Sequence, residues 1–207
     1  MVAALWRHTT TSDIVKSPKE TISNRRKYML TYYAVDRRGL FKQNERVQLA
    51  TISDTSKFSE QAAIQFNAGI SPHGITYFIG DNFHVHNNVN QPAACIEYAL
   101  ELLRQQRYPE KPSRFLSVFG CETLDGAKHF RGQYEPHKLS TPIYEITSNG
   151  KVHKGDMNLL DARCPVYEFE NRLDAYWSGE SYPLYESYEP FWEIIIPLPA
   201  NIGALVA

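Results

Sequence analysis

Long hydrophobic runs are missing from this sequence. No apolar stretch approaches the ~20 residues that a membrane-spanning helix needs, and the N-terminus has no hydrophobic core region of the kind that a Sec signal peptide carries. Cysteine is also scarce, because Cys95, Cys121 and Cys164 are widely separated and form no C-x-x-C pair. This pattern argues against a zinc ribbon and against a disulfide framework, and it fits a reducing compartment.

An excess of one charge is absent as well. Lysine and arginine total 22 and aspartate and glutamate total 23, so the formal net charge is -1. Nucleic acids and anionic membranes attract proteins that carry a marked basic surplus. We therefore expect neither a nucleic acid nor a membrane as a partner.

Sequence motifs for nucleotide and metal binding are also lacking. The chain contains no G-x-G-x-x-G after a strand, no G-x-x-x-x-G-K-[ST], no H-E-x-x-H and no G-x-S-x-G. His84 and His86 in "FHVHNN" would share one face of a strand, as zinc ligands often do, but a third ligand is not evident. We therefore predict no metal site.

What the chain does contain is enough apolar material for one domain. It has 207 residues, of which 43% are hydrophobic, and it is rich in aromatic residues, with 13 Tyr, 10 Phe and 3 Trp. Residues 1–27 are rich in Ser, Thr and charge, which predicts a flexible tail. Such a tail is compatible with an ordinary frayed terminus or with a secretion signal. We place the folded domain at residues 28–207.

Apolar periodicity predicts helices and strands in mixed order. Helical spacing marks residues 56–69, 90–108, 124–130 and 165–177. Strands are predicted at residues 28–35, 75–80, 113–119 and 141–152, and as two extended pieces within 191–206 that Pro197 and Pro199 separate. Because the later strands follow one another without crossover helices, we predict an α+β fold with two packed, mostly antiparallel sheets flanked by helices.

Two polar residues interrupt the apolar stretch "SRFLSVFG" at 113–120. Side chains alternate between the faces of a regular strand, so Phe115 and Ser117 would share one face and Arg114 would lie on the other. We predict Phe115 and Ser117 in a cleft and a structural role for Arg114. Other polar residues lie near the ends of predicted strands, and each of them alone is better explained by a structural role: Asp36, Arg37, Arg38, His73, Asp156 and Glu193.

Five short segments occur in a suggestive order: "YYAVDRRG", "GISPHGITYF", "PSRFLSVF", "DMNLL" and "YWSGE". Their order resembles the ADP-ribosyltransferase fold, and most closely a family of bacterial effectors of the CteC type, which ADP-ribosylate a threonine of host ubiquitin. The resemblance covers roughly residues 28–207. It implies a mono-ADP-ribosyltransferase that uses NAD as co-substrate, modifies a host protein such as ubiquitin, and is secreted into the host cytoplasm by a type III-like system.

The resemblance also implies roles for individual residues. Ala34 occupies the position where relatives carry the histidine or arginine that grips the NAD ribose, so Arg37 or His73 would have to replace it. Asp156 falls on the acidic position, and Glu193 is the alternative catalytic acid. The expected NAD-contacting residues are Tyr33, Asp36, Arg37, His73, Tyr77, Phe115 and Ser117.

The residues themselves leave two other functions open. The chain would be a non-catalytic binding module of the same fold if the substitution at Ala34 marks lost chemistry. It would be a cysteine hydrolase if Cys121 acts with His129 or His137. Four aromatic residues near the C-terminus would suit a protein-docking surface, although ordinary packing explains them equally well: Tyr182, Tyr185, Tyr188 and Trp192.

Overall fold

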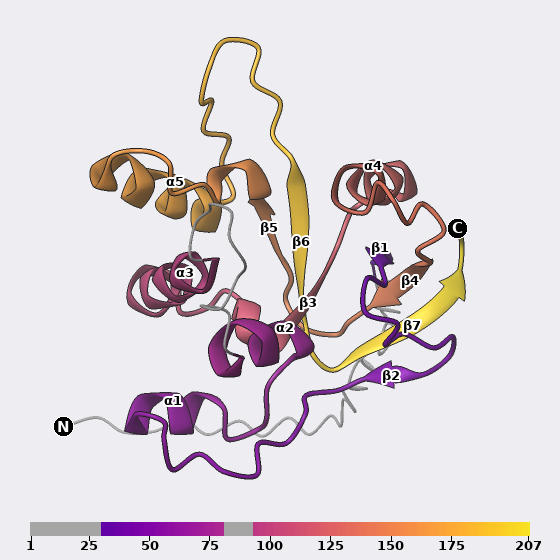
Figure 1. The fold of residues 1–207 in the computed structure, drawn as a ribbon, viewed down its shortest axis with the longest axis horizontal. Helices are drawn as coiled ribbons and strands as arrows, with labels where there is room; N and C mark the ends of the chain where they lie inside the picture. Colours follow the sequence, from indigo (N-terminus) through magenta and orange to yellow (C-terminus); the bar gives the residue numbers. More distant parts are fainter. Residues whose placement is uncertain (1–29, 81–92) are drawn as a thin grey trace, which may run out of the picture.

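The computed structural model describes residues 30–80 and 93–207, and its fold is α+β with two antiparallel sheets (Figure 1). The expected tail and the His84/His86 pair lie outside the described residues. The four-stranded sheet has the order β1 (Tyr32–Val35), β4 (Ile143–Thr147), β7 (Ala200–Leu205), β2 (Arg46–Val47). The three-stranded sheet has the order β3 (Ser117–Gly120), β6 (Trp192–Pro197), β5 (His153–Asp156).

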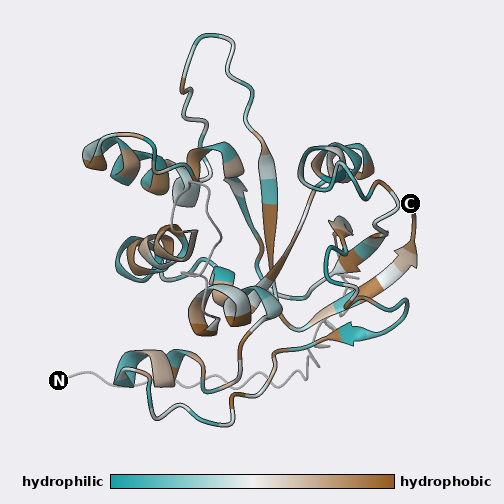
Figure 2. Ribbon diagram, viewed as in Figure 1, coloured by the Kyte–Doolittle hydropathy of each residue, from teal (hydrophilic) through white to brown (hydrophobic). Residues whose placement is uncertain are grey.

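The chain passes from one sheet to the other between β6 and β7. As predicted, prolines separate these two extended pieces, because β6 ends at Pro197 and Pro199 precedes β7. β6 lies between two partners and is buried over most of its length, which explains its continuous apolar run. Figure 2 shows the hydrophilic start of this strand giving way to a hydrophobic second half.

Helices cover one side of the three-stranded sheet, and a further helix covers β1 of the four-stranded sheet. The helical elements are α1 (Glu60–Gln65), α2 (Pro72–Gly74), the π-helix η1 (Ile75–Ile79), α3 (Ala93–Arg107), the 3₁₀ helix η3 (Arg114–Leu116), α4 (Leu124–Tyr134), the 3₁₀ helix η4 (Met157–Leu159) and α5 (Val166–Ser178). Figure 1 shows α3 and α5 stacked on the same side of β5 and β6, with α4 on the other side above β1. The helices predicted around 56–69, 90–108, 124–130 and 165–177 are therefore confirmed, with α1 shorter than expected.

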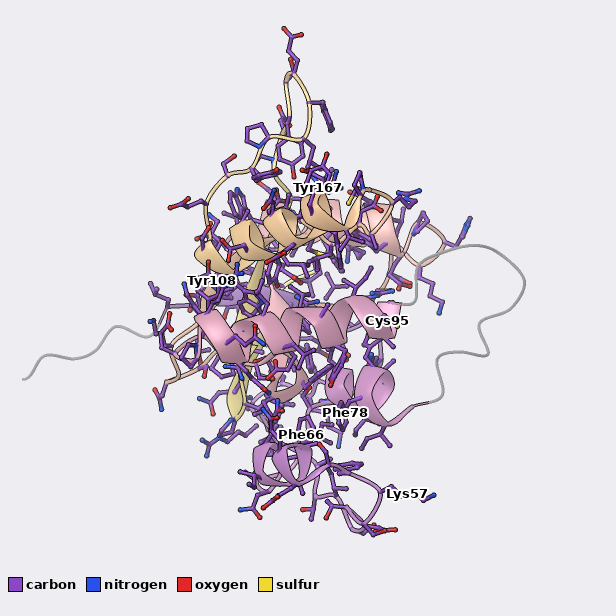
Figure 3. All side chains as sticks on the ribbon, turned by 90° about the vertical axis from the view of Figure 1, so that its left-hand side faces the viewer. Lys57, Phe66, Phe78, Cys95, Tyr108 and Tyr167 are labelled. Atoms are coloured by element: carbon purple, nitrogen blue, oxygen red, sulfur yellow. The ribbon has the colours of Figure 1, made fainter. Side chains whose placement is uncertain are left out.

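The apolar residues form several cores between these layers. One joins the two sheets through Ala34, Val118 and Ile196, among others. A second packs α3 and α5 against β6 through Leu100, Trp177 and Ile195. A third holds α1 and η1 below α3, and Figure 3 shows two of its rings, Phe66 and Phe78, on the side of α3 that faces α1. Most of the buried aromatic residues therefore serve packing.

The prediction of a strand at residues 75–80 is wrong, because this segment is helical. Ser71 caps the start of α2 by accepting a hydrogen bond from the Gly74 N–H, and Pro72 occupies the first turn. The helix continues as a π-helix, in which the Gly80 N–H donates to the Ile75 carbonyl oxygen at 2.8 Å. A short apolar run fits a strand or a buried helix equally well, and here the capping residues favoured the helix.

The strand predicted at 113–119 is only partly correct. Residues Arg114–Leu116 form a 3₁₀ helix, and the strand begins at Ser117. Side chains three residues apart in a 3₁₀ helix lie above one another, so alternation does not separate Arg114 from Ser117. Both line the same cleft, contrary to the prediction from regular strand geometry.

None of the helices in the two described segments is long and apolar enough to cross a bilayer.

Candidate functional site

A cleft of about 440 Å³ opens where the two sheets meet, within the range of small-molecule sites. Its walls come from β1 and the loop after it, from α2 and η1, from Arg114 and the stretch Ser117–Cys121, from α4, from η4 and the residue after it, and from single residues of α3 and β6. Aromatic rings supply much of the lining: Tyr33, Phe41, Tyr77, Phe119, Phe130 and Tyr134.

The position of the cleft follows from a short link between the sheets. Tyr33 in β1 and Cys121, just after β3, exchange two backbone hydrogen bonds of 2.9 and 2.8 Å. Gly120 lies beside this link, and a Cβ there would come within 3.1 Å of the Tyr33 carbonyl oxygen. The two strands can therefore approach closely at this one point, and the cleft lies along it.

A buried network of charged and polar side chains forms one wall of the cleft. Arg114 donates from Nε and Nη2 to the two carboxylate oxygens of Glu97 at 2.7 and 2.8 Å, and from Nη1 to Glu193 and Tyr176. The Tyr176 hydroxyl also donates to Glu193 Oε1 at 2.7 Å. His73 Nε2 lies 3.1 Å from Glu97 Oε1, but it is off the line of a well-formed hydrogen bond.

Five elements bring these side chains together. His73 comes from α2, Glu97 from α3, Arg114 from η3, Tyr176 from α5 and Glu193 from β6. The network therefore depends on the whole domain. Removing Arg114 would leave two buried carboxylates without their cation, which is costly.

Burial and neighbouring charges set the ionisation of this network. Burial is the largest influence on Glu97 and would raise its pKa, but the Arg114 guanidinium and His73 outweigh it and hold the pKa well below the usual range. Burial opposes the charge on Arg114, yet Glu193 and Glu97 raise its pKa well above the ordinary value. Burial raises the pKa of Tyr176 well above 10, so its hydroxyl keeps its proton.

The cleft gathers most of the residues expected from the sequence. Tyr33, Asp36, Arg37, His73, Tyr77, Ser117 and Glu193 all line it.

Several of these side chains are already occupied within the protein. The Asp36 carboxylate accepts from the N–H groups of Leu40 and Phe41, both at 2.9 Å. The Ser117 hydroxyl donates to the Ser113 carbonyl oxygen at 2.6 Å and is fully buried. Asp36 and Ser117 therefore shape the cleft.

Phe115 and Asp156 lie outside the cleft lining. The Phe115 ring is buried against Phe66 in the core beneath α3. Asp156 is fully buried, and its Oδ1 accepts from the N–H groups of Asn158 at 3.0 Å and Phe191 at 2.9 Å. Its Oδ2 accepts from the Tyr188 hydroxyl. Asp156 therefore fastens the start of η4 to the segment that leads into β6.

Sequence reasoning missed Glu97 and Tyr176. Glu97 was overlooked because α3 was interpreted only through its apolar stripe. A signal was present, since Glu97 and Glu101 lie four residues apart and straddle Leu100 on the buried side of the helix. Acidic residues on a buried helix face need partners, and Arg114 and Arg104 are those partners. Tyr176 carried no comparable signal.

The geometry around Cys121 does not resemble a cysteine hydrolase site. Burial raises the pKa of the Cys121 thiol to about 11, and Glu193 adds to the effect, whereas a nucleophilic cysteine needs a lowered pKa. His129 and His137 are exposed, whereas Cys121 is buried. Residues 30–80 and 93–207, which the structure describes, hold no group of three or more potential metal ligands.

The four aromatic residues near the C-terminus have different environments. Tyr182 donates to Glu168 at 3.0 Å, Tyr188 donates to Asp156, and Lys154 lies over the Trp192 ring at 4.9 Å. Tyr185 is 65% exposed. Figure 1 shows the segment between α5 and β6, which carries the three tyrosines, projecting away from the body of the domain. Of the four, Tyr185 is the side chain most open to a partner.

Comparison with known proteins identifies one family. A family model described as "Protein of unknown function (DUF2441)" matches residues 10–197. No curated protein matches the chain.

Proposed function

The chain belongs to this family of unknown function, and we propose that it is an NAD-dependent mono-ADP-ribosyltransferase whose active site is the cleft beside Glu193. The α+β fold with two antiparallel sheets is compatible with an ADP-ribosyltransferase-like domain. The resemblance in the order of short segments supplies the reaction, and the contents of the cleft support it.

One observation carries the proposal: a buried carboxylate in the wall of an aromatic cleft. Glu193 is 5% exposed and lines the cleft. Its Oε1 accepts from Tyr176 and Arg114, whereas no hydrogen bond reaches Oε2 from the described residues. One oxygen is therefore anchored, and the other is available to a bound ligand.

The proposed reaction needs a carboxylate of this kind. When the bond between ribose C1′ and nicotinamide breaks, its electron pair goes to the nicotinamide nitrogen and the ribose becomes an oxocarbenium-like cation, as in glycoside cleavage. A fixed negative charge stabilises the cation as it forms. Glu193 Oε2, acting on the ribose hydroxyl groups, would supply that charge. Asp156 is the weaker candidate, because both of its oxygens already accept hydrogen bonds.

The other cleft residues suit the remaining parts of NAD. Tyr33 and Tyr77 supply aromatic rings to the cleft wall, against which nicotinamide can stack while water is excluded. Arg37 and Arg38 line the outer part of the cleft on the exposed loop after β1, where guanidinium groups can pair with a pyrophosphate. Arg37 is held beside α4 by Glu135, with Nε 2.7 Å from Oε1.

The acceptor is proposed from the resemblance alone. It is a protein of the host cell, and a threonine of ubiquitin is the acceptor to test first. From the same resemblance we propose that the protein is a bacterial effector secreted by a type III-like system. Tyr185, on the projecting segment after α5, is the exposed aromatic residue with which such a partner would make contact.

Incubation with NAD labelled in its adenylate half, in the presence of a host-cell lysate or purified ubiquitin, tests the proposal. We expect a labelled protein band together with release of nicotinamide. Release of nicotinamide without a band would indicate a glycohydrolase. Binding of NAD without turnover would indicate the non-catalytic module. This outcome is worth testing because Glu193, the proposed catalytic carboxylate, is already paired with Arg114.

A further inference from the structure

His73 is held in the wall of the cleft by its surroundings. Its ring lies between Tyr77, at 4.6 Å between ring centroids, and Phe119, at 4.7 Å. The short helix α2 can lie this close to η3 because Gly74 follows His73, and a Cβ on Gly74 would lie 2.5 Å from the Phe115 carbonyl oxygen. The imidazole is therefore fixed in orientation by packing on both sides.

The two nitrogens of His73 have different environments. Nε2 is buried and lies 3.1 Å from Glu97 Oε1, and it makes no well-formed hydrogen bond with the described residues. Nδ1 makes no hydrogen bond with the described part of the chain. The side chain as a whole is 14% exposed, and Nε2 contributes nothing to that exposure. The contact with Glu97 favours the tautomer that carries its proton on Nε2, which leaves the lone pair of Nδ1 free for a ligand.

Glu97 is itself fixed. Both of its oxygens accept from Arg114, so its carboxylate cannot rotate away from His73. The same guanidinium contacts Glu193. One arginine therefore positions two carboxylates, one beside the imidazole and one beside the expected position of the ribose.

Glu97 and Glu193 carry two negative charges against the single positive charge of Arg114. A positive charge that develops on the imidazole during the reaction would therefore form beside an excess of negative charge.

We propose that His73 is the general base that takes the proton from a hydroxyl-bearing acceptor, and that Glu97 is the positioning residue behind it. This inference rests on the proposed transferase function and names the acceptor class of the same site. As the acceptor oxygen bonds to ribose C1′ and nicotinamide leaves with the electron pair of the broken bond, the hydroxyl proton moves to Nδ1. The imidazolium that forms faces Glu97 and later returns its proton to water. This role differs from the NAD contact expected for His73 from the sequence.

His73→Ala tests the assignment, with His137→Ala as the matched control, because His137 is exposed and lies outside the cleft. We expect transfer to a protein hydroxyl to fall by ~10²–10⁴ in His73→Ala, the usual contribution of a general base. The affinity for NAD should not change, and added imidazole should restore part of the lost rate. Glu97→Gln should lower kcat for transfer and leave KM for NAD unchanged. His137→Ala should behave like the wild type.

Different results would overturn the inference in recognisable ways. Transfer by His73→Ala at the wild-type rate would exclude His73 as the base. A loss of NAD affinity that accounts for the whole loss of rate, with no rescue by imidazole, would show that His73 contacts NAD instead. If the wild type itself transferred nothing, the proposed function would fail and this inference with it. Thermal melting of each variant separates these results from unfolding.

Discussion

Replacing Arg114 with methionine should destabilise the protein far more than the same change at an exposed arginine. Arg114 is buried and holds Glu97 through two hydrogen bonds, while its remaining nitrogen contacts Glu193 and Tyr176. Arg114→Met leaves two buried carboxylates without their cation. Breaking a buried pair in this way typically costs ~3–5 kcal/mol, which corresponds to a fall in Tm of roughly 6–20 °C for a domain of this size.

The pH dependence of this loss has a definite sign. In the wild type the folded-state pKa of Glu97 lies below its ordinary value of 4.5. At pH values above 4.5 the ionised Glu97 therefore contributes to stability, and this contribution is lost as the pH falls through the folded-state pKa. Without Arg114, burial dominates, the pKa of Glu97 rises, and acidification relieves the penalty by protonating it. The difference in unfolding free energy between the two proteins should therefore shrink from about pH 7 to about pH 5.

Urea unfolding followed by intrinsic tryptophan fluorescence, to which the buried Trp177 contributes, measures this difference. Arg37→Met is the matched control, because the pair of Arg37 with Glu135 is partly exposed and such pairs contribute only ~0–1 kcal/mol. A loss below about 1 kcal/mol in Arg114→Met, or a difference that grows on acidification, would refute the assignment of Arg114 as the counter-ion of this network.

Two further predictions concern single side chains. Near neutral pH, iodoacetamide should modify the exposed Cys95 and spare Cys121, because burial raises the pKa of the Cys121 thiol to about 11. Peptide mass spectrometry measures the labelling of each cysteine, and equal labelling of the two would contradict the prediction. Asp156→Ala should lower stability by at least ~1–3 kcal/mol, since the Phe191 N–H and the Tyr188 hydroxyl lose a buried acceptor. An unchanged melting temperature would argue against that structural role.

The sequence predicted the regular parts of the fold because their signals are local. The apolar stripe of α3 and the prolines between β6 and β7 act through neighbouring residues. The segments 75–80 and 113–119 were misassigned because a short apolar run does not distinguish a strand from a helical turn. In both segments the capping serine decides the local structure: Ser71 accepts from the Gly74 N–H, and Ser113 accepts from the Phe115 N–H.

The candidate site was harder to predict because it depends on contacts far apart in the chain. His73 and Glu193 were chosen as polar residues near predicted strand ends, and Tyr77 was chosen as an NAD contact implied by the resemblance. The cleft does bring the three together. Arg114 was assigned to the wrong face because the alternation rule was applied to a 3₁₀ helix. Glu97 was missed because its partners lie 17 or more residues away, where no local pattern connects them.

The most direct test of the central claim measures nicotinamide release and NAD affinity on three proteins: the wild type, Glu193→Gln and Glu122→Gln. Glu122 is the matched control, since its carboxylate is exposed and forms a surface ion pair with Lys154. We predict that Glu193→Gln binds NAD as the wild type does but releases nicotinamide ~10²–10³ times more slowly, while Glu122→Gln is unaffected. Release by Glu193→Gln at the wild-type rate would contradict the claim that this buried carboxylate stabilises the ribose cation.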